Sequence, residues 1–256
     1  MSALPLATLL EELVPVIRAA GAVVMDIYRT DFSVRGKDDA SPVTAADERA
    51  EALIVPALER LLPGVPVVAE EAVAAGRLPD IGRHFWLVDP LDGTKEFISR
   101  NGEFTVNIAL VEDGAPVLGA VLAPAIDRLF LGARGVGAFV EQGQARTPIH
   151  CRRVPAEGLT VVASRSHGDA AALDAFLAGR TVAALKNAGS SLKLCLVASG
   201  EADLYPRLGR TMEWDIAAGH AVLAAAGGQV RTLAGEALRY GKPGLDNPHF
   251  VASGAA

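Results

Sequence analysis

Acidic side chains follow apolar stretches at separate points of the chain, as they do in sites built at the ends of strands. Glu70 comes directly after the apolar residues 65–69, and Asp89 and Asp92 come after the apolar residues 85–88. In α/β proteins, ligands usually bind at the carboxyl ends of strands. Carboxylates that a fold brings together repel one another, which raises some of their pKa values unless cations lie between them. The pattern is therefore consistent with a site for cations.

Further acidic residues extend this pattern at Asp47, Glu71 and Asp215. Oxygen-only ligands suit Mg²⁺, Mn²⁺ or Ca²⁺, and a chain with 2 Cys and 5 His offers little to zinc or copper. Mg²⁺ held by a few carboxylates beside a substrate phosphate is the usual arrangement for phosphoryl chemistry. Taken singly, each acidic residue also has a simpler explanation, as a turn residue, a helix start or a solvated strand end. From their spacing alone, a metal site and these simpler explanations are equally supported.

Residues 89–94, Asp-Pro-Leu-Asp-Gly-Thr, have the features of an anion-binding turn. Pro90 stiffens the backbone, and Gly93 lets the main chain approach a ligand closely. A helix is predicted to begin near Thr94, and the free N–H groups of its first turn would point at an anion.

Two amphipathic helices are predicted to precede these motifs. Apolar residues recur at helical spacing over residues 6–27, where Pro15 is expected to kink the helix or to mark the start of its regular part. Residues 44–47, Thr-Ala-Ala-Asp, resemble a capping box and predict the start of a second helix, which contains Pro56. A mostly antiparallel set of strands follows, expected at residues 65–69, 85–88, 104–110, 117–122, 128–131 and 137–140.

Strands and helices alternate in the last part of the chain. Strands are expected at residues 159–163, 181–184, 202–205 and 229–232, and helices at residues 170–177, 191–198 and 214–226. The fold class predicted for the whole chain is therefore mixed α/β, with an antiparallel N-terminal sheet and a smaller C-terminal α/β part. Gly and Pro residues near 142–158 indicate a boundary there, which gives the subdomains 1–145 and 146–256.

The composition of the 256 residues, 50% hydrophobic and 21% charged, is that of a globular protein and excludes a disordered chain. A net charge of −6 provides no basic field, so no nucleic-acid partner is expected. Cys151 and Cys195 stand in no disulfide or zinc spacing, which favours a reducing, cytoplasmic compartment. The first cation is Arg18, which argues against a signal peptide. The longest near-apolar stretch, residues 117–126, is far short of the roughly 20 residues of a membrane span, so none is expected.

Several motifs together resemble a known family, the inositol-monophosphatase-like, lithium-sensitive phosphatases. Residues 86–94 look like its signature WxxDPxDGT, and residues 214–219 with 226–228 look like its second signature, WDxAAG…AGG. Residues 70–71 match the acidic pair of the family, and residues 41–47 match its early segment. The order and the separations agree over roughly residues 35–230. The resemblance implies a layered α/β/α/β/α sugar-phosphatase fold and inhibition by Li⁺.

Within this family the chain is most similar to the bacterial CysQ branch of 3′(2′),5′-bisphosphate nucleotidases, on residues 95–109, 164–167 and 189–193. Those enzymes convert adenosine 3′,5′-bisphosphate to AMP and phosphate, so a small bisphosphorylated nucleotide is the implied substrate, with its sulfated form, 3′-phosphoadenylyl sulfate, as a further candidate. An inositol monophosphatase would more usually show Asp-Gly-Thr-Thr-Asn-Phe at residues 92–97, where this chain has Asp-Gly-Thr-Lys-Glu-Phe. Residues 71–76, in contrast, are closer to the inositol branch, which keeps an inositol or sugar-phosphate phosphatase as the alternative.

The resemblance also implies roles for individual residues. It implies about two or three Mg²⁺ ions per site, with Mn²⁺ as a substitute. The positions that match metal ligands are Glu70, Asp89, the Leu91 carbonyl, Asp92 and Asp215. Asp47 and Thr94 match the catalytic pair that orients the attacking water. Substrate contacts are implied for Glu70, Leu91, Asp92, Gly93, Thr94 and Asp215 and, on the nucleotide side, for His167, Ser190, Lys193 and Arg207. Most metal ligands then belong to the N-terminal subdomain, and Asp215 and the nucleotide contacts to the C-terminal one.

A non-enzymatic alternative is an inactive homologue that binds a nucleotide or a metal. Such a chain would be expected to lose part of the water-orienting pair or a metal carboxylate, and this one retains all of these residues. Trp86 and Trp214 are expected in the core, and the glycines of residues 132–137 are expected in a β-turn. The oligomeric state stays open between monomer and homodimer. A peripheral location at the cytoplasmic face of the inner membrane also stays open.

Overall fold

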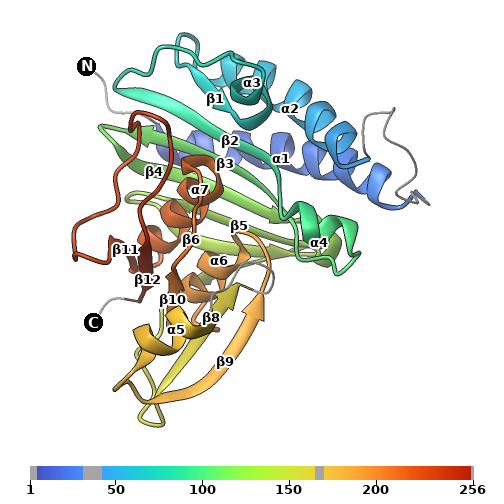
Figure 1. The fold of residues 1–256 in the computed structure, drawn as a ribbon. Coiled ribbons are helices and arrows are strands. Elements are labelled where there is room, and N and C mark those ends of the chain that lie inside the picture. The colour runs from blue at the N-terminus through green and yellow to red at the C-terminus, as the bar shows by residue number, and fades with distance from the viewer. Residues whose placement is uncertain (1–4, 31–41, 165–169, 255–256) are drawn as a thin grey trace.

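The computed structural model describes residues 5–30, 42–164 and 170–254 and shows two β-sheets with helices between and outside them (Figure 1). The first sheet contains β1 (Val67–Ala69), β2 (His84–Asp92), β3 (Thr105–Glu112), β4 (Ala115–Ala123), β5 (Arg128–Ala133), β6 (Gly137–Gln142) and β7 (Ala145–Ile149). Its strands lie in chain order, and every neighbouring pair is antiparallel except β1 and β2, which are parallel. The predicted antiparallel N-terminal sheet is confirmed.

The first sheet is buried on both faces, which explains the continuous apolar runs of its strands. Side chains of a strand point alternately to opposite faces. On β2, Trp86 and Val88 belong to the hydrophobic cluster formed with α1 (Leu6–Tyr28) and α2 (Pro42–Leu61). Phe85 and Leu87 belong to the cluster that includes α6 (Leu192–Ala198) and α7 (Glu213–Ala225). The acidic end of β2 is thereby held between two packed layers.

Two glycines bring α7 unusually close to the first sheet. A Cβ atom on Gly119 of β4 would lie 2.3 Å from the Ala218 carbonyl oxygen, and one on Gly132 of β5 would lie 2.6 Å from the Val222 Cα. No real Cβ could occupy these positions without a shift of the helix. These contacts fix the height of α7 above the sheet, and with it the position of Asp215 in the first turn of the helix.

The second sheet is mixed, in the order β11 (Gln229–Thr232), β12 (Phe250–Ser253), β10 (Leu204–Arg207), β8 (Leu159–Ser164) and β9 (Val182–Ala188). The parallel crossover from β8 to β9 runs through α5 (Ala170–Leu177), and the return to β10 runs through α6 in the opposite direction. Right-handed crossovers in opposite directions place their helices on opposite faces of the sheet. Since α6 packs toward β4, this rule places α5 on the opposite, outer side of the second sheet, where α5 has no buried residue and β9 is exposed except at Ala188.

The structure corrects some details of the predicted elements. The described part of α2 begins at Pro42, so Thr44 lies within its first turn and the predicted capping box is wrong; proline is well suited to a first helical turn, where no N–H is needed. Asp89 and Asp92 lie inside β2 rather than beyond it, because the strand continues to Asp92 through an irregularity in its pairing. Residues 134–136 form the turn between β5 and β6, so Gly135 lies in a turn as predicted, whereas Gly132 lies in β5 and Gly137 begins β6.

The connection between the sheets runs from residue 150 to residue 158, inside the predicted boundary region. The strand β7 was not predicted, and it belongs to the first sheet. If the chain is divided according to its two sheets, the first part therefore ends at Ile149. In the described ranges, no helix has both the length and the apolar character that crossing a membrane requires.

Candidate functional site

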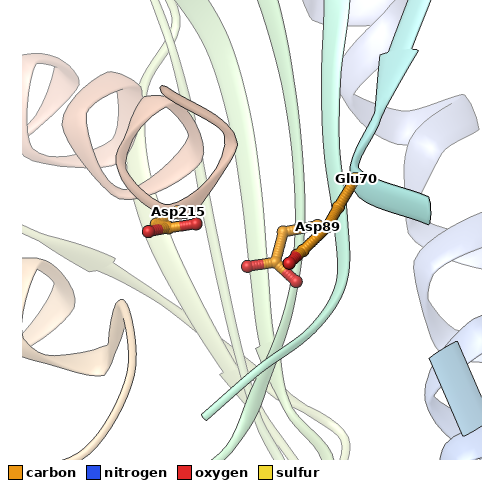
Figure 2. Close-up of side chains that lie close together, drawn as sticks. All are labelled: Glu70, Asp89 and Asp215. Carbon is orange, nitrogen blue, oxygen red and sulfur yellow. The ribbon is translucent and has the colours of Figure 1, made fainter. Parts of the chain in front are cut away.

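Three carboxylates converge from separate elements: Glu70, Asp89 and Asp215 (Figure 2). One oxygen of each lies within 4.8 Å of the others. Glu70 is the first residue of α3 (Glu70–Ala74), immediately after β1, and Asp89 lies on β2. Parallel pairing of Ala69 with Val88 places the following residues, Glu70 and Asp89, side by side. The first turn of α7 brings Asp215 from the other side, as Figure 2 shows.

The electrostatics of this group favour the binding of a cation. Burial raises the pKa of Asp89 well above its ordinary value, and the nearby charges of Glu70 and Asp92 raise it further. Burial, with repulsion from Asp92, raises the pKa of Glu70 to about 7 and that of Asp215 well above the usual range. Bringing a divalent cation between such groups relieves both the burial penalty and the mutual repulsion. Because the possible metal ligands are all carboxylate oxygens, these three residues fit a hard cation such as Mg²⁺.

Asp92 lines the same cavity as the three carboxylates but is held by a contact of its own. Its Oδ2 accepts a hydrogen bond from the Ser191 N–H at 2.6 Å. Burial raises the pKa of Asp92, and the charge of Lys193 opposes that rise. Leu91 also lines the cavity, and its N–H donates to Oδ1 of Asp89 at 3.0 Å. This bond fixes the turn within β2 that separates the two aspartates.

Gly93 and Thr94 form the corner where β2 passes into α4 (Thr94–Ile98), the predicted helix start. Gly93 has a φ of +95°, a conformation that favours glycine. A Cβ atom there would also lie 3.3 Å from the Phe104 Cα and 3.3 Å from the Ser190 Cβ. The glycine thus allows the main chain to pass between two neighbouring segments while Thr94 lines the cavity.

Asp47 lies on α2 at the edge of the carboxylate group and is buried, with 6% of its surface exposed. Its burial raises its pKa to about 8, with smaller contributions from the charges of Glu71 and Glu70. Asp47 in turn raises the pKa of Asp89 slightly. The structure therefore places Asp47 in the electrostatic neighbourhood of the site, and its pairing with Thr94 stays a prediction.

Cationic side chains line the same cavity as the carboxylates. Lys193 is buried, and its Nζ donates to the carbonyl oxygens of Ala188 at 3.2 Å and Ser190 at 2.5 Å. Burial lowers the pKa of Lys193 to about 8, although the charge of Asp92 opposes the change. Arg207 donates through Nη2 to the Arg210 carbonyl at 3.0 Å. Its Nε is buried and has no hydrogen-bond partner among the described residues.

The cavity has a volume of about 420 Å³, enough for a small organic phosphate. It is lined by Glu70, Asp89, Leu91, Asp92, Gly93, Thr94, Lys95, Glu96, Ser164, Ser190, Ser191, Lys193, Tyr205, Arg207, Arg210, Thr211, Asp215 and Ile216. The predicted contact residues thus line one cavity, except Asp47, which is not among the lining residues, and His167, which lies outside the described residues.

Several lining residues were not predicted from the sequence, including Glu96, Tyr205 and Arg210. The Nζ of Lys193 lies 5.4 Å from the centre of the Tyr205 ring. A signal for Tyr205 was available in the sequence, because side chains two apart on a strand point to the same face. Once Arg207 is assigned to the site, Tyr205, two residues earlier on the same strand, is expected to point toward the site as well.

Comparisons with known proteins find similar sequences over nearly the whole chain. The model of a protein family, "Inositol monophosphatase family", matches residues 6–254. The 3′(2′),5′-bisphosphate nucleotidase CysQ of Escherichia coli (strain K12) is 45% identical over 96% of this chain and 99% of its own. The protein of that name from Salmonella typhimurium (strain LT2) is 46% identical over 91% of this chain and 94% of its own.

Chains of similar fold are also found among solved structures. The crystal structure of CysQ from Bacteroides thetaiotaomicron, described as a bacterial member of the inositol monophosphatase family, has a TM-score of 0.86 and 37% identity, and the match covers 98% of this chain and 99% of that one. An inositol monophosphatase from Anabaena has a TM-score of 0.77 and 28% identity, covering 97% and 91% of the two chains.

Proposed function

Because the chain belongs to the inositol monophosphatase family, we propose that it is a metal-dependent 3′(2′),5′-bisphosphate nucleotidase. Its reaction is hydrolysis of the 3′-phosphate of adenosine 3′,5′-bisphosphate to AMP and inorganic phosphate, with 3′-phosphoadenylyl sulfate as a further substrate. The similarity of nearly the whole chain to curated CysQ enzymes supports the choice of substrate. The convergence of Glu70, Asp89 and Asp215 on one cavity is the observation that carries the chemistry.

The residues proposed to hold Mg²⁺ are Glu70, Asp89, the carbonyl of Leu91, Asp92 and Asp215. When bound, the ions would supply positive charge to the phosphate and to the leaving oxygen and would activate water for attack. Their number, about two or three, follows from the family resemblance. Without a cation, this acidic site would repel an anionic ester, so metal removal should abolish binding as well as turnover.

The chain's own residues are proposed to orient the reactants. Thr94 lines the cavity at the start of α4, and we assign it, with Asp47, to the positioning of the attacking water. In this arrangement Asp47 accepts the hydrogen bond of the threonine hydroxyl, so that the Thr94 oxygen can accept one from water. The main chain at Gly93 and the Asp92 side chain would contact the phosphate that is removed.

The cationic wall is proposed to bind the nucleotide and its retained 5′-phosphate. Lys193 and Arg207 supply positive charge, and the unpartnered Nε of Arg207 is a buried donor that a ligand oxygen would satisfy. Ser190 lines the same cavity. His167 is assigned to the same function on the family resemblance. A substrate with two phosphates would thus bridge the metal-binding side and the cationic side.

Phosphate release from adenosine 3′,5′-bisphosphate and from inositol 1-phosphate, at equal enzyme concentration, tests the proposal. We expect a preference of at least about a hundredfold in kcat/KM for the bisphosphate, since the cationic wall would have no partner on the inositol ester. EDTA should abolish the reaction and added Mg²⁺ should restore it. A preference for the inositol ester would assign the chain to the inositol branch. Absence of turnover of either ester in Mg²⁺ would contradict the enzymatic function itself.

A further inference from the structure

The Asp215 carboxylate is oriented by the main chain just before it. Its Oδ2 accepts a hydrogen bond from the Met212 N–H at 2.9 Å, and this bond sets the orientation of the carboxylate. Thr211, the preceding residue, lines the cavity together with Asp215. Any displacement of residues 211–212 would therefore move the carboxylate. The contacts that fix these two residues decide how Asp215 meets its ligand.

Residues 211–212 are fixed by Asn247, in the long connection between β11 and β12 (Figure 1). The Asn247 Nδ2 donates to the Met212 carbonyl oxygen at 2.8 Å and to the Thr211 Oγ1 at 3.3 Å, and its N–H donates to the Thr211 carbonyl at 2.9 Å. Met212 also forms an isolated antiparallel bridge with Asp246. Asn247 itself is buried.

This connection is in turn fastened to the first residue of α7, Glu213, whose side chain is fully buried. Its carboxylate accepts hydrogen bonds from the Gly241 N–H at 2.6 Å, the Lys242 N–H at 3.0 Å and the Lys242 Nζ at 2.5 Å. The same Nζ donates to the Asn247 Oδ1 at 3.1 Å. The ammonium group thus joins Glu213 to Asn247.

The connection also holds one residue in an uncommon conformation. Leu245 has a φ of +58°, and its carbonyl accepts a hydrogen bond from the Glu213 N–H at 2.8 Å. A left-handed leucine is unfavourable and persists only where surrounding contacts impose it. Such conformations often occur next to functional sites, where they contribute to preorganisation.

Glu213 does not reach the cation site itself. Residues two apart on a helix do not share a face, and the cavity is lined by Asp215 and Ile216 but not by Glu213. We propose that Glu213, Lys242 and Asn247 form a clamp that acts through residues 211–212 to hold the Asp215 carboxylate in the orientation that binds the divalent cation. They are positioning residues, and this inference rests on the proposed metal-dependent function.

Calorimetric titration of Mg²⁺ into the full chain and its Lys242→Met variant tests the clamp. Loss of the ammonium removes the link between Glu213 and Asn247 and should raise the Mg²⁺ dissociation constant about tenfold or more, the usual effect of losing a group that orients a metal ligand. At saturating Mg²⁺, kcat should stay within about threefold of the parent value, so that the loss is one of metal affinity.

Arg152→Met is the matched control. Arg152 bonds Asp203 at 2.8 Å, and the Asp203 side chain is as fully buried as that of Glu213, but neither Arg152 nor Asp203 lines the cavity. The control should lower the melting temperature in EDTA as Lys242→Met does and leave the Mg²⁺ dissociation constant within about twofold of the parent value. If the two variants lose Mg²⁺ affinity equally, or if Lys242→Met loses none, the clamp is wrong.

Asn247→Ser gives a second measurement should Lys242→Met not fold. It removes the Nδ2 bonds to the Met212 carbonyl and the Thr211 Oγ1 while leaving the Glu213–Lys242 ion pair, and it should weaken Mg²⁺ binding by a similar factor. Unchanged Mg²⁺ affinity in Asn247→Ser contradicts the clamp. A parent protein that binds no Mg²⁺ contradicts the proposed function and the clamp together, whereas a parent that binds Mg²⁺ while the variants match it contradicts the clamp alone.

Discussion

The main-chain N–H of Ser191 donates a hydrogen bond to Oδ2 of Asp92 at 2.6 Å, across 99 positions of the sequence. Asp92 ends β2 of the first sheet, and Ser191 immediately precedes α6, which leads to the second sheet. The Ser191 hydroxyl also donates to the Asn107 Oδ1 at 2.6 Å and lies 2.9 Å from the Thr105 Oγ1 on β3. The two parts of the chain are therefore joined at the cavity wall, where the carboxylates and the cations face each other.

Asp215→Asn should abolish activity and stabilise the metal-free protein. The asparagine keeps an oxygen for the Met212 N–H and removes one of three repelling carboxylates. We expect kcat to fall by at least about a thousandfold, as for other groups that stabilise developing charge. Relief of about 1 kcal/mol of repulsion should raise the melting temperature in EDTA by about 2–4 °C. Phosphate release and thermal unfolding in EDTA measure the two effects.

Near-normal turnover in Asp215→Asn would remove this residue from the catalytic site. A lower melting temperature in EDTA would show instead that the carboxylate stabilises the metal-free fold. Asp203→Asn is the control for a carboxylate that stabilises the fold. The Asp203 side chain is buried, but its ion pair with Arg152 offsets the burial and lowers the Asp203 pKa. That variant should lose stability in EDTA and in Mg²⁺ alike.

The metal-free protein should become less stable as the pH rises through neutrality. Burial raises the folded-state pKa of Glu70 to about 7 and that of Asp47 to about 8. In the unfolded chain such carboxyls titrate near about 4, so between about pH 4 and pH 8 these two carboxyls bind more protons in the folded state. The free energy of unfolding therefore falls with rising pH across that window.

Melting temperatures in EDTA from about pH 5.5 to pH 8 test this sign, and we expect a decrease of several degrees. Saturating Mg²⁺ should flatten the decrease, because the bound cation favours the ionised carboxylates at every pH. A melting temperature in EDTA that rises or stays constant over the same range would show that these groups are already ionised in the metal-free fold.

Gly119→Ala should destabilise the protein and weaken metal binding together. The added Cβ would lie 2.3 Å from the Ala218 carbonyl oxygen, which forces α7 away from the sheet and moves Asp215 with it. Overpacking of this kind costs about 1–3 kcal/mol. Gly82→Ala is the matched control, because a Cβ there meets nothing within 4 Å. Urea unfolding and Mg²⁺ titration should distinguish the two variants, and equal behaviour would contradict the close-contact explanation.

Arg207→Met should reduce kcat/KM mainly for substrates that carry a second phosphate. Loss of the guanidinium should lower kcat/KM for adenosine 3′,5′-bisphosphate at least about tenfold, whereas 3′-AMP, which lacks the 5′-phosphate, should lose much less. Arg207→Lys should restore only part of the preference, because an ammonium cannot make the paired contacts of a guanidinium. An equal loss for both substrates would assign Arg207 to structure rather than to recognition of the 5′-phosphate.

Strongly patterned elements could be predicted from the sequence, and weakly patterned ones could not. The helix predicted at residues 170–177 and the strand predicted at residues 229–232 have these bounds in the structure. β7 was missed because it is an edge strand whose residues are exposed except the last and include Pro148, so no apolar alternation marks it. β12 was missed because its four residues become a strand only by pairing with β10 and β11.

The site was predictable in part. Local sequence places Glu70 and Asp89 after apolar runs, and a parallel pairing of those strands brings them together. Asp215 arrives through a long-range contact, the packing of α7 on Gly119, that no local pattern indicates. The sequence placed Asp215 among the acidic residues, but its role as a metal ligand was implied only by the family resemblance. The contacts of Glu213 with residues 241–242 were likewise beyond the sequence, because they join segments that are 28 and 29 positions apart.

The convergence of Glu70, Asp89 and Asp215 on a divalent cation is tested most directly by anomalous diffraction from crystals soaked in Mn²⁺. We expect a manganese peak among the three carboxylates, and its loss in Asp215→Asn crystals treated in the same way. Crystals that show manganese only elsewhere, or none at this site under conditions where the enzyme turns over, would contradict it.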